Sequence, residues 1–372
     1  MKNVLRLIIL ILSFIFQTSA WASLEQGLAA AQKGDFKTAL QVFLPLAEKG
    51  DSKAQYHTGV LFEVGQGLPL DYQAAAIWYR KAAEQGYAAA QANLGRLYET
   101  GLGVPQDYKA AMDWYSRAAE QGDAFAQASL GGIYSLGKGG VKDIEAAIKW
   151  YRKAAEQGNA FAQSKLAEMY FYGQGVMQDH TVAGFWYQKA AEQGDLESQI
   201  NLGLIYSSGM GVLSNYKTAM HWLLKAADQG SPKAWLKIGT MYEVGLGVSQ
   251  DFKTAMGWYL KAANQGYAEA QFALAKMYAD GRGVQQDFKL AVSWYRKAAE
   301  LWNPNAQNNL GLAYDKGLGV EADPLQAYKW YSLAAESGLQ AAMLNRHRLE
   351  ARMTAEQIEQ AKELVSASRT KQ

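Results

Sequence analysis

Apolar and small side chains recur along most of this chain at the spacing of α-helices. Between Ala54 and Ala89, one group of such residues has offsets of 0, 3, 4, 7 and 8, which form a single stripe on a helix. This group is Ala75, Trp78, Tyr79, Ala82 and Ala83. An earlier group, Ala54, Leu61 and Phe62, fits a helix that precedes it. The pattern therefore predicts two helices in this segment, which we name helix A and helix B.

The same segment returns with a fixed period. Tryptophans stand 36 positions apart at Trp78, Trp114, Trp150, Trp186, Trp222, Trp258, Trp294 and Trp330. Counted from Ala54, eight units of this length follow one another without an insertion over residues 54–341. Such a period indicates a solenoid, in which each helical hairpin needs its neighbours to bury its apolar face. We therefore predict a single all-α domain of tandem helix-turn-helix repeats.

The two ends of the chain depart from the repeat, as terminal units of a solenoid do when one face meets water. Residues 23–53 are predicted to form an N-terminal capping half-repeat, and residues 342–372 a C-terminal capping helix and tail. Thr354 and Gln357 have the spacing of a capping box, in which each side chain accepts from the backbone amide of the other residue. They predict the start of the last helix.

Glycine and aspartate mark the ends of the predicted helices. An acidic or amide residue precedes helix B in every unit and is predicted to cap its first free amides. These residues are Asp71, Asp107, Asp143, Asp179, Asn215, Asp251, Asp287 and Asp323. Glycine follows helix B in every unit except the seventh. A glycine at the end of a helix suits a left-handed cap. Trp302 stands there in the seventh unit, so we expect Asn303 or a changed geometry to end that repeat.

The first residues have the pattern of a secretory signal. Lys2 and Arg6 provide the positive start, Leu7–Phe16 the apolar core, and residues 20–22 the small-x-small cleavage site. The apolar run is shorter than the about 20 residues that span a bilayer. We therefore predict a signal peptide over residues 1–22, cleaved after Ala22, and a periplasmic or secreted protein with no stable membrane anchor after cleavage.

Charge and cysteine content narrow the class of partner. Removal of the signal takes away two basic residues and no acidic residue, so 35 basic side chains remain against 35 acidic ones. A net charge of zero argues against nucleic acid or anionic lipid as a partner. The chain has no cysteine, so packing between repeats must supply its stability without disulfides.

The repeated residues resemble the signature of Sel1-like repeats, which are relatives of the tetratricopeptide repeat. In one unit the signature is Leu94-Gly95, Tyr98, Gly101-Leu102-Gly103-Val104, Asp107, Lys109-Ala110, Trp114-Tyr115, Ala118-Ala119 and Gly122. The resemblance covers Leu24 to about Ser366. It implies a right-handed α-solenoid that assembles other macromolecules. Exported bacterial members resemble adaptors in envelope biogenesis, polysaccharide export, and passage into or trafficking within host cells.

Residues suited to catalysis or metal binding are sparse. The four histidines, His57, His180, His221 and His347, lie at different repeat positions and far apart along the chain. The Gly-x-Gly pairs lie between two helices and lack the strand that precedes a nucleotide-binding loop. The repeated aspartates occupy a capping position, which is a simpler explanation than acid–base chemistry. We therefore predict no catalytic residue, no metal site and no cofactor.

Helix A positions outside the core stripe differ most between units, and by resemblance to tetratricopeptide units they line the concave wall. In the third to seventh units these positions carry Phe125, Phe161, Phe171, Ile200, Leu204, Leu236 and Phe272. Flanking units carry polar residues such as Arg96, Glu99 and Asp315. An apolar centre with a polar rim is typical of a protein-binding groove. The alternative is that these apolar side chains pack against the adjacent A helix.

The sequence therefore predicts an exported scaffold that binds protein partners through its concave helix A surface. A cell-wall enzyme, or a protein that binds peptidoglycan or β-lactams, is the alternative, by analogy with cysteine-rich relatives whose cysteine pairs this chain lacks. Trp235 replaces a glutamine that recurs in the other units, either as a packing variant or as a binding anchor.

Overall fold

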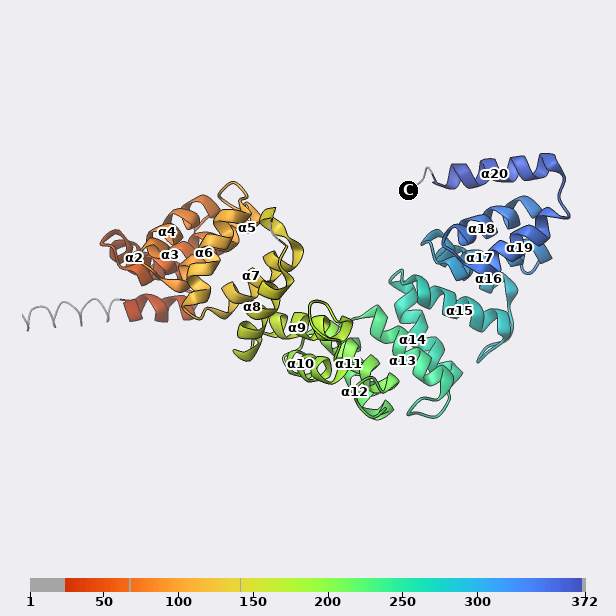
Figure 1. The fold of residues 1–372 in the computed structure, drawn as a ribbon, viewed down its shortest axis with the longest axis horizontal. Helices are drawn as coiled ribbons and strands as arrows, with labels where there is room; N and C mark the ends of the chain where they lie inside the picture. Colours follow the sequence, from red (N-terminus) through yellow and green to blue (C-terminus); the bar gives the residue numbers. More distant parts are fainter. Residues whose placement is uncertain (1–23, 67, 141, 370–372) are drawn as a thin grey trace, which may run out of the picture. The chain divides into compact units, whose positions relative to one another are not determined.

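The computed structural model describes residues 24–66, 68–140 and 142–369. Within these ranges every regular element is a helix, and connections between helices are short (Figure 1). The chain divides into two compact units, the first ending at Gln193 and the second beginning at Gly194. The signal peptide predicted over residues 1–22 lies outside the described residues. None of the described helices combines the length and apolar character that crossing a membrane requires.

The first unit opens with a helix over residues 24–32. It continues with α2 (Phe36–Glu48), α3 (Ser52–Val64), α4 (Tyr72–Glu84), α5 (Ala88–Thr100), α6 (Tyr108–Glu120), α7 (Ala124–Leu136), the 3-10 turn η1 (Lys138–Gly140), α8 (Ile144–Glu156), α9 (Ala160–Tyr172) and α10 (His180–Glu192). The second unit contains α11 (Leu196–Ser208), α12 (Tyr216–Asp228), α13 (Pro232–Val244), α14 (Phe252–Asn264), α15 (Ala268–Asp280), α16 (Phe288–Glu300), α17 (Pro304–Lys316), α18 (Pro324–Glu336), α19 (Gln340–Glu350) and α20 (Ala355–Arg369).

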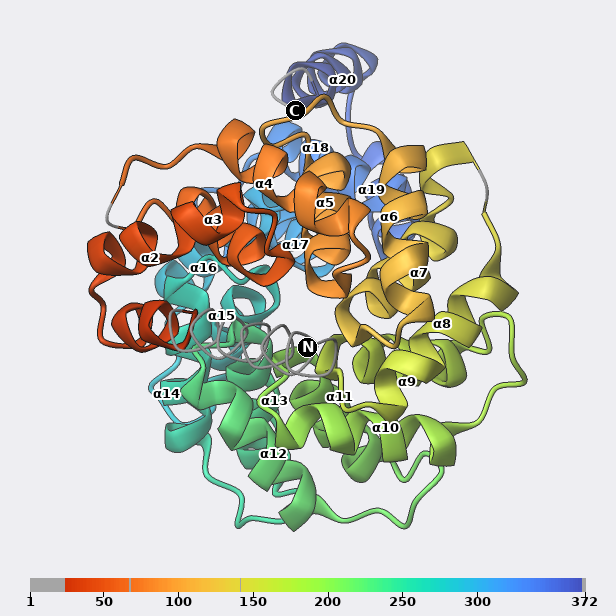
Figure 2. The ribbon, with the colours of Figure 1, turned by 90° about the vertical axis from the view of Figure 1, so that its left-hand side faces the viewer.

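Odd-numbered helices from α3 to α17 are the predicted A helices, and even-numbered helices from α4 to α18 are the B helices. Within each of the two compact units, every A helix packs against the B helix of the same repeat, and that B helix packs against the A helix of the next repeat in the same compact unit (Figures 1 and 2). In the first unit α7 also contacts α5 and α9, so successive A helices touch each other directly. This tandem packing of helical pairs confirms the predicted all-α solenoid.

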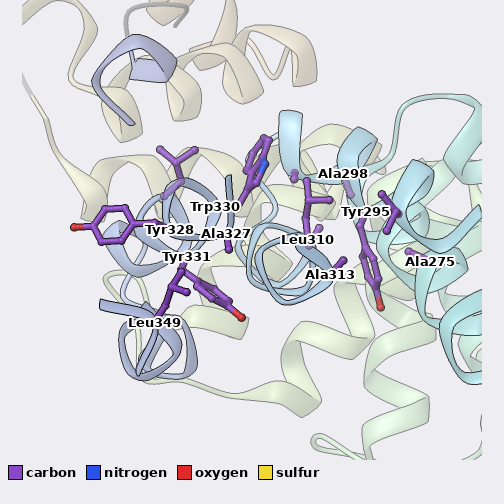
Figure 3. Packing of buried hydrophobic residues seen from close by; sticks show 14 of the residues in the cluster. Ala275, Tyr295, Ala298, Leu310, Ala313, Ala327, Tyr328, Trp330, Tyr331 and Leu349 are labelled. Atoms are coloured by element: carbon purple, nitrogen blue, oxygen red, sulfur yellow. The ribbon is translucent and has the colours of Figure 1, made fainter. Parts of the chain in front are cut away.

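A glycine on helix A lets helix B approach closely. A Cβ atom on Gly95 of α5 would lie 2.8 Å from a ring carbon of Tyr115, a completely buried residue of α6. Gly311 and Tyr331 form the same pair in the second unit, and Figure 3 shows Tyr331 within the core around Leu310 and Ala313. A larger residue at these glycines would force the two helices apart, so the repeat keeps them small.

The helix caps follow the sequence prediction. Each aspartate or asparagine before a B helix accepts from amides of the first turn, as Asp107 does from Lys109 N at 2.9 Å and Ala110 N at 3.1 Å. Trp302 takes the same left-handed conformation as the glycines that end the other repeats, with φ of 62°, so the geometry of this turn does not change. Asn303 then caps α17 by accepting from Ala306 N.

In five repeats, a pair of glutamines ties the A helix to the B helices on either side. Gln91 of α5 donates through Nε2 to the carbonyl of Ala83, at the end of α4, at 3.0 Å. Its Oε1 then accepts from Gln121 Nε2, at the end of α6, at 2.8 Å. We name this arrangement the glutamine pair. It recurs as Gln55 with Gln85, Gln127 with Gln157, Gln163 with Gln193 and Gln199 with Gln229.

Trp235 stands where the first glutamine of a pair is expected, and its role is structural. The indole Nε1 donates to the carbonyl of Ala227 at 3.1 Å, which is the bond that the glutamine makes in other repeats. The ring also packs beside the cores of α12 and α14. The structure therefore favours the packing interpretation of Trp235 over that of a binding anchor.

The last helix begins as its capping box predicts. Thr354 N donates to Gln357 Oε1 at 2.9 Å, and Gln357 N donates to Thr354 Oγ1 at 3.2 Å. Helix α20 buries Ala361 and Val365 and packs against α18. This contact covers apolar surface of the last repeat, as a terminal cap must.

Candidate functional site

The predicted partner-binding residues fall into both compact units. Phe125, Phe161 and Phe171 belong to the first unit, and the other four belong to the second. Their exposure differs widely, because the helix A positions outside the core stripe do not all face solvent. The structure therefore separates the candidates one by one.

Ile200 is a core residue, and its assignment to a binding surface is corrected. Its side chain is 1% exposed and packs in a cluster with Leu223 and Ile238. The equivalent residues Ala92 and Ala128 of the earlier repeats are buried as well. This helix A position therefore faces the neighbouring helices, as the packing alternative proposed.

Three further candidates of the second unit are only half-buried. Leu236 and Phe272 pack against the cores around Tyr259 and Tyr295, and the rings of Phe272 and Tyr295 lie 5.9 Å apart. Leu204 has intermediate exposure on α11. Leu236 and Phe272 therefore make contacts within the solenoid, and each of the three side chains leaves only part of its surface to a partner.

Phe171 belongs to an aromatic cluster at the end of α9. Its ring meets those of Tyr172, His180 and Tyr187 edge to face, at centroid distances of 5.0, 4.8 and 6.3 Å. Phe171 is half-buried there, so it holds α9 against the start of α10. Tyr172 projects outward from the same cluster with 61% of its surface exposed.

Phe125 and Phe161 are the candidates that solvent reaches most freely. They occupy the same position on α7 and α9 and are 43% and 52% exposed. Each ring leans edge to face on the buried tyrosine of the preceding B helix, with centroid distances of 6.1 Å to Tyr115 for Phe125 and 6.2 Å to Tyr151 for Phe161. Tyr115 lies on α6 and Tyr151 on α8, so both phenylalanines pack where an A helix meets the B helix before it.

A cavity of about 500 Å³ opens beside Phe161, between α7, α8 and α9. Its apolar lining includes Phe161, Leu136, Ile144, Tyr151 and Met169. Leu136 ends α7 and is 67% exposed. We name these five residues and the space they enclose the α7–α9 hollow. An exposed apolar rim around a recess of this size is suited to receiving an apolar side chain.

Charged groups border the hollow. Lys142, Lys165 and Glu168 line it, and Lys165 Nζ lies 2.7 Å from Glu168 Oε2. Burial raises the pKa of the Tyr151 hydroxyl, so it stays protonated at neutral pH and can donate a hydrogen bond. Across the described residues, no three of His, Cys, Asp or Glu gather as a metal site would require. The hollow therefore offers apolar contact and a few polar partners.

The predicted polar rim is largely engaged within the solenoid. Glu99 accepts from the Tyr115 hydroxyl at 3.0 Å, and Asp315 pairs with Arg352 at 2.8 Å. Arg96 forms an ion pair with Glu63 of the preceding A helix. These groups join neighbouring helices.

The sequence analysis missed Leu136, Ile144 and Tyr172. Leu136 and Tyr172 are the last residues of their A helices, directly before the left-handed glycines Gly137 and Gly173. Their signal in the sequence is a large apolar or aromatic residue at a position that is polar in four other units, as at Thr100 and Ser208, and valine in two.

The fold and this surface define a helical-repeat scaffold. The Sel1 repeat matches eight segments of the chain, residues 52–87, 88–123, 124–159, 160–195, 196–231, 232–267, 268–301 and 304–339. The chain therefore belongs to the Sel1 repeat family. The matched segments begin with the A helices, two residues before the units counted from Ala54.

Two crystal structures of bacterial proteins are similar over most of their length. A protective antigen with an SLR fold, present in uropathogenic Escherichia coli strains, is 31% identical with a TM-score of 0.66, covering 96% of this chain and 94% of that chain. A Sel1 repeat protein from Oxalobacter formigenes is 34% identical with a TM-score of 0.65, covering 83% and 90%. A search of curated proteins gave no match.

Proposed function

We propose that this chain is an exported scaffold that binds a polypeptide partner at the α7–α9 hollow. The observation that carries the proposal is the exposure of Phe161 and Leu136 at the mouth of a cavity. Exposing apolar side chains around a recess to water costs free energy, and this free energy is regained when a partner covers them. A partner residue with an apolar side chain would fill the hollow, as anchor residues do at protein interfaces.

The N-terminal sequence supports export. Residues 1–22 have the charge, apolar length and cleavage site of a secretory signal. The Escherichia coli relative is described as a protective antigen, which fits a protein that antibodies can reach. We therefore propose a periplasmic or secreted location, and a role in envelope assembly or in contact with host cells.

Capture experiments with matched variants test the proposed surface. The mature protein is immobilised and exposed to the envelope fraction of its source cell. The double variant Phe161→Ser, Leu136→Ser should lose the captured polypeptide by about tenfold or more, because anchor residues dominate interface energies. Ile77→Ser is the control, since Ile77 is 56% exposed on α4, away from the hollow. Both variants should melt close to the unaltered protein, because the substituted side chains are exposed.

Two results would contradict the proposal. One is capture of the same polypeptide by the Phe161→Ser, Leu136→Ser variant and the unaltered protein to equal extents. The other is measurable hydrolysis of a chromogenic β-lactam or of peptidoglycan by the mature protein, which would favour the enzymatic alternative. Binding should also change little between low and high salt, because apolar anchors are not screened.

A further inference from the structure

A second cavity lies in the C-terminal unit, where α16 ends and α17, α18 and α20 meet. Its volume is about 320 Å³, and its lining includes Trp302, Gln307, Lys329, Trp330 and Leu333. Lys329 Nζ lies 4.4 Å from the ring centre of Trp330. Figure 3 shows that the Trp330 ring leaves α18 in a different direction from Tyr328 and Tyr331. We name this cavity the Trp302 pocket.

The pocket contains a buried hydrogen-bond acceptor. Gln307 is 1% exposed, and its Nε2 donates to the carbonyl of Ala299 at 3.2 Å. Its Oε1 accepts no hydrogen bond from any of the described residues. A buried carbonyl oxygen without a donor costs free energy, so a ligand that supplies a donor there gains affinity.

The repeat itself shows which group this acceptor takes. In five earlier repeats the equivalent Oε1 accepts from the carboxamide of a second glutamine, at distances from 2.7 to 2.9 Å. The second glutamine of this pair is replaced by Ser337. Serine is too short to reach as glutamine does, so the acceptor and the space beside it are both left to a ligand.

The residue that forms one wall of the pocket, Trp302, also departs from the repeated sequence. Trp302 stands where the other units have glycine, adopts φ of 62°, and is 39% exposed. A left-handed conformation is strained for a bulky residue, and such strain clusters at ligand sites. An indole ring on the pocket wall adds a flat apolar surface next to the acceptor.

We propose that the Trp302 pocket binds the side-chain carboxamide of a glutamine presented by a polypeptide partner. The carboxamide donates to Gln307 Oε1, as the second glutamine does in earlier repeats, and the glutamine methylenes contact Trp302 and Trp330. A glutamate side chain is rejected, because an ionised carboxylate has no proton to donate. The inference rests on the proposed function only in taking the ligand to be a polypeptide, since the two cavities lie in different units.

Fluorine NMR of the full mature chain labelled with 5-fluorotryptophan tests this inference. The signals of Trp302 and Trp330 are assigned from Trp302→Phe and Trp330→Phe variants. The probes are the blocked peptides acetyl-Ala-Ala-Gln-Ala-Ala-methylamide and its Glu and Met counterparts. Titration with the Gln peptide should shift both signals, and the Glu and Met peptides should bind about tenfold more weakly or worse, because they lack the donor.

Ser337→Gln is the decisive variant, because it restores the second glutamine of the pair. It should raise the melting temperature by satisfying Gln307 Oε1, and it should abolish the shifts caused by the Gln peptide. Phe161→Ser, Leu136→Ser should leave these shifts unchanged, so the two binding proposals fail separately. Equal shifts with all three peptides, shifts that persist in Ser337→Gln, or a response to N-acetylglucosamine in place of the Gln peptide would overturn the inference.

Discussion

Single replacements within the repeat decide where the solenoid has unsatisfied groups. Gln271 and Gln307 both have an Oε1 that accepts no hydrogen bond from the described residues. In both cases the second glutamine of the pair is missing, because Leu301 and Ser337 stand in its place. The strained Trp302 follows Leu301 directly. Departures from the repeat therefore mark the positions where one repeat differs from the others in its hydrogen bonds and in its surface.

Acid should destabilise the protein through His57. Burial lowers the pKa of His57 below its ordinary value of 6.5, and Phe43 stacks on the ring at 5.2 Å. Between the lowered pKa and 6.5 the unfolded chain binds more protons than the folded one, so stability falls as pH falls below about 6.5. The melting temperature should drop by a few degrees from about pH 7.5 to about pH 5.5, and less in His57→Gln.

The exposed His347, with a side chain that is 83% exposed, provides the control for this measurement. His347→Gln should keep the pH dependence of the unaltered protein. An identical pH dependence in His57→Gln and the unaltered protein would show that His57 contributes nothing to the loss of stability in acid.

The helices begin where side chains cap them, and this is the level at which the sequence is most informative. Asp107 accepts from two amides at the start of α6, and the equivalent residue of each of the other seven repeats accepts from one or two. Six of the A helices have a side-chain cap as well, from Asp51, Asp123, Asn159, Asp195, Ser231 and Asn303. Tyr87 and Tyr267 precede α5 and α15 without such a bond.

Removal of one B-helix cap should have a local and measurable effect. Asp107→Ala leaves the amides of Lys109 and Ala110 without their acceptor and should lower the free energy of unfolding by about 1 kcal/mol. Asp113→Ala is the matched control, because Asp113 is exposed in the middle of the same helix. Urea unfolding measures both. Equal losses in the two variants would mean that the cap contributes no more than surface charge.

The sequence predicted the helices better than it predicted their exposed faces. Caps, glycines and apolar stripes are local features, so they placed α6 and α20 correctly. Exposure depends on which neighbour covers a position. Ile200 is buried and Phe161 is exposed, although both are apolar residues outside the repeated stripe. The glutamine pair was also missed, because its bonds join residues 30 positions apart and the period alone does not show which helices meet.

At the scale of many repeats, the interfaces between repeats within the first compact unit resemble one another. The buried face that α5 presents to α4 includes Ala90, Gln91 and Leu94. The face that α7 presents to α6 includes Ala126, Gln127 and Leu130, the same residue types in the same order. In a solenoid of this kind, stability is approximately a sum over repeats and their interfaces.

Deletion of one whole repeat should therefore preserve folding. Removal of residues 88–123 joins Tyr87 to Ala124 and places α7 against α4, where Gln127 can donate to the carbonyl of Ala83 as Gln91 does. We expect a cooperative urea transition whose m-value is smaller by roughly a tenth, in proportion to the surface lost.

Removal of residues 88–105 is the matched control, because it places a B helix against α4, whose packing residues fit an A helix. Helical content by circular dichroism should then fall well beyond the 18 residues removed, since an out-of-phase stripe leaves both neighbours without a partner. Equal damage from the two deletions would contradict interchangeable interfaces and would make the identity of each repeat, rather than its phase, the source of stability.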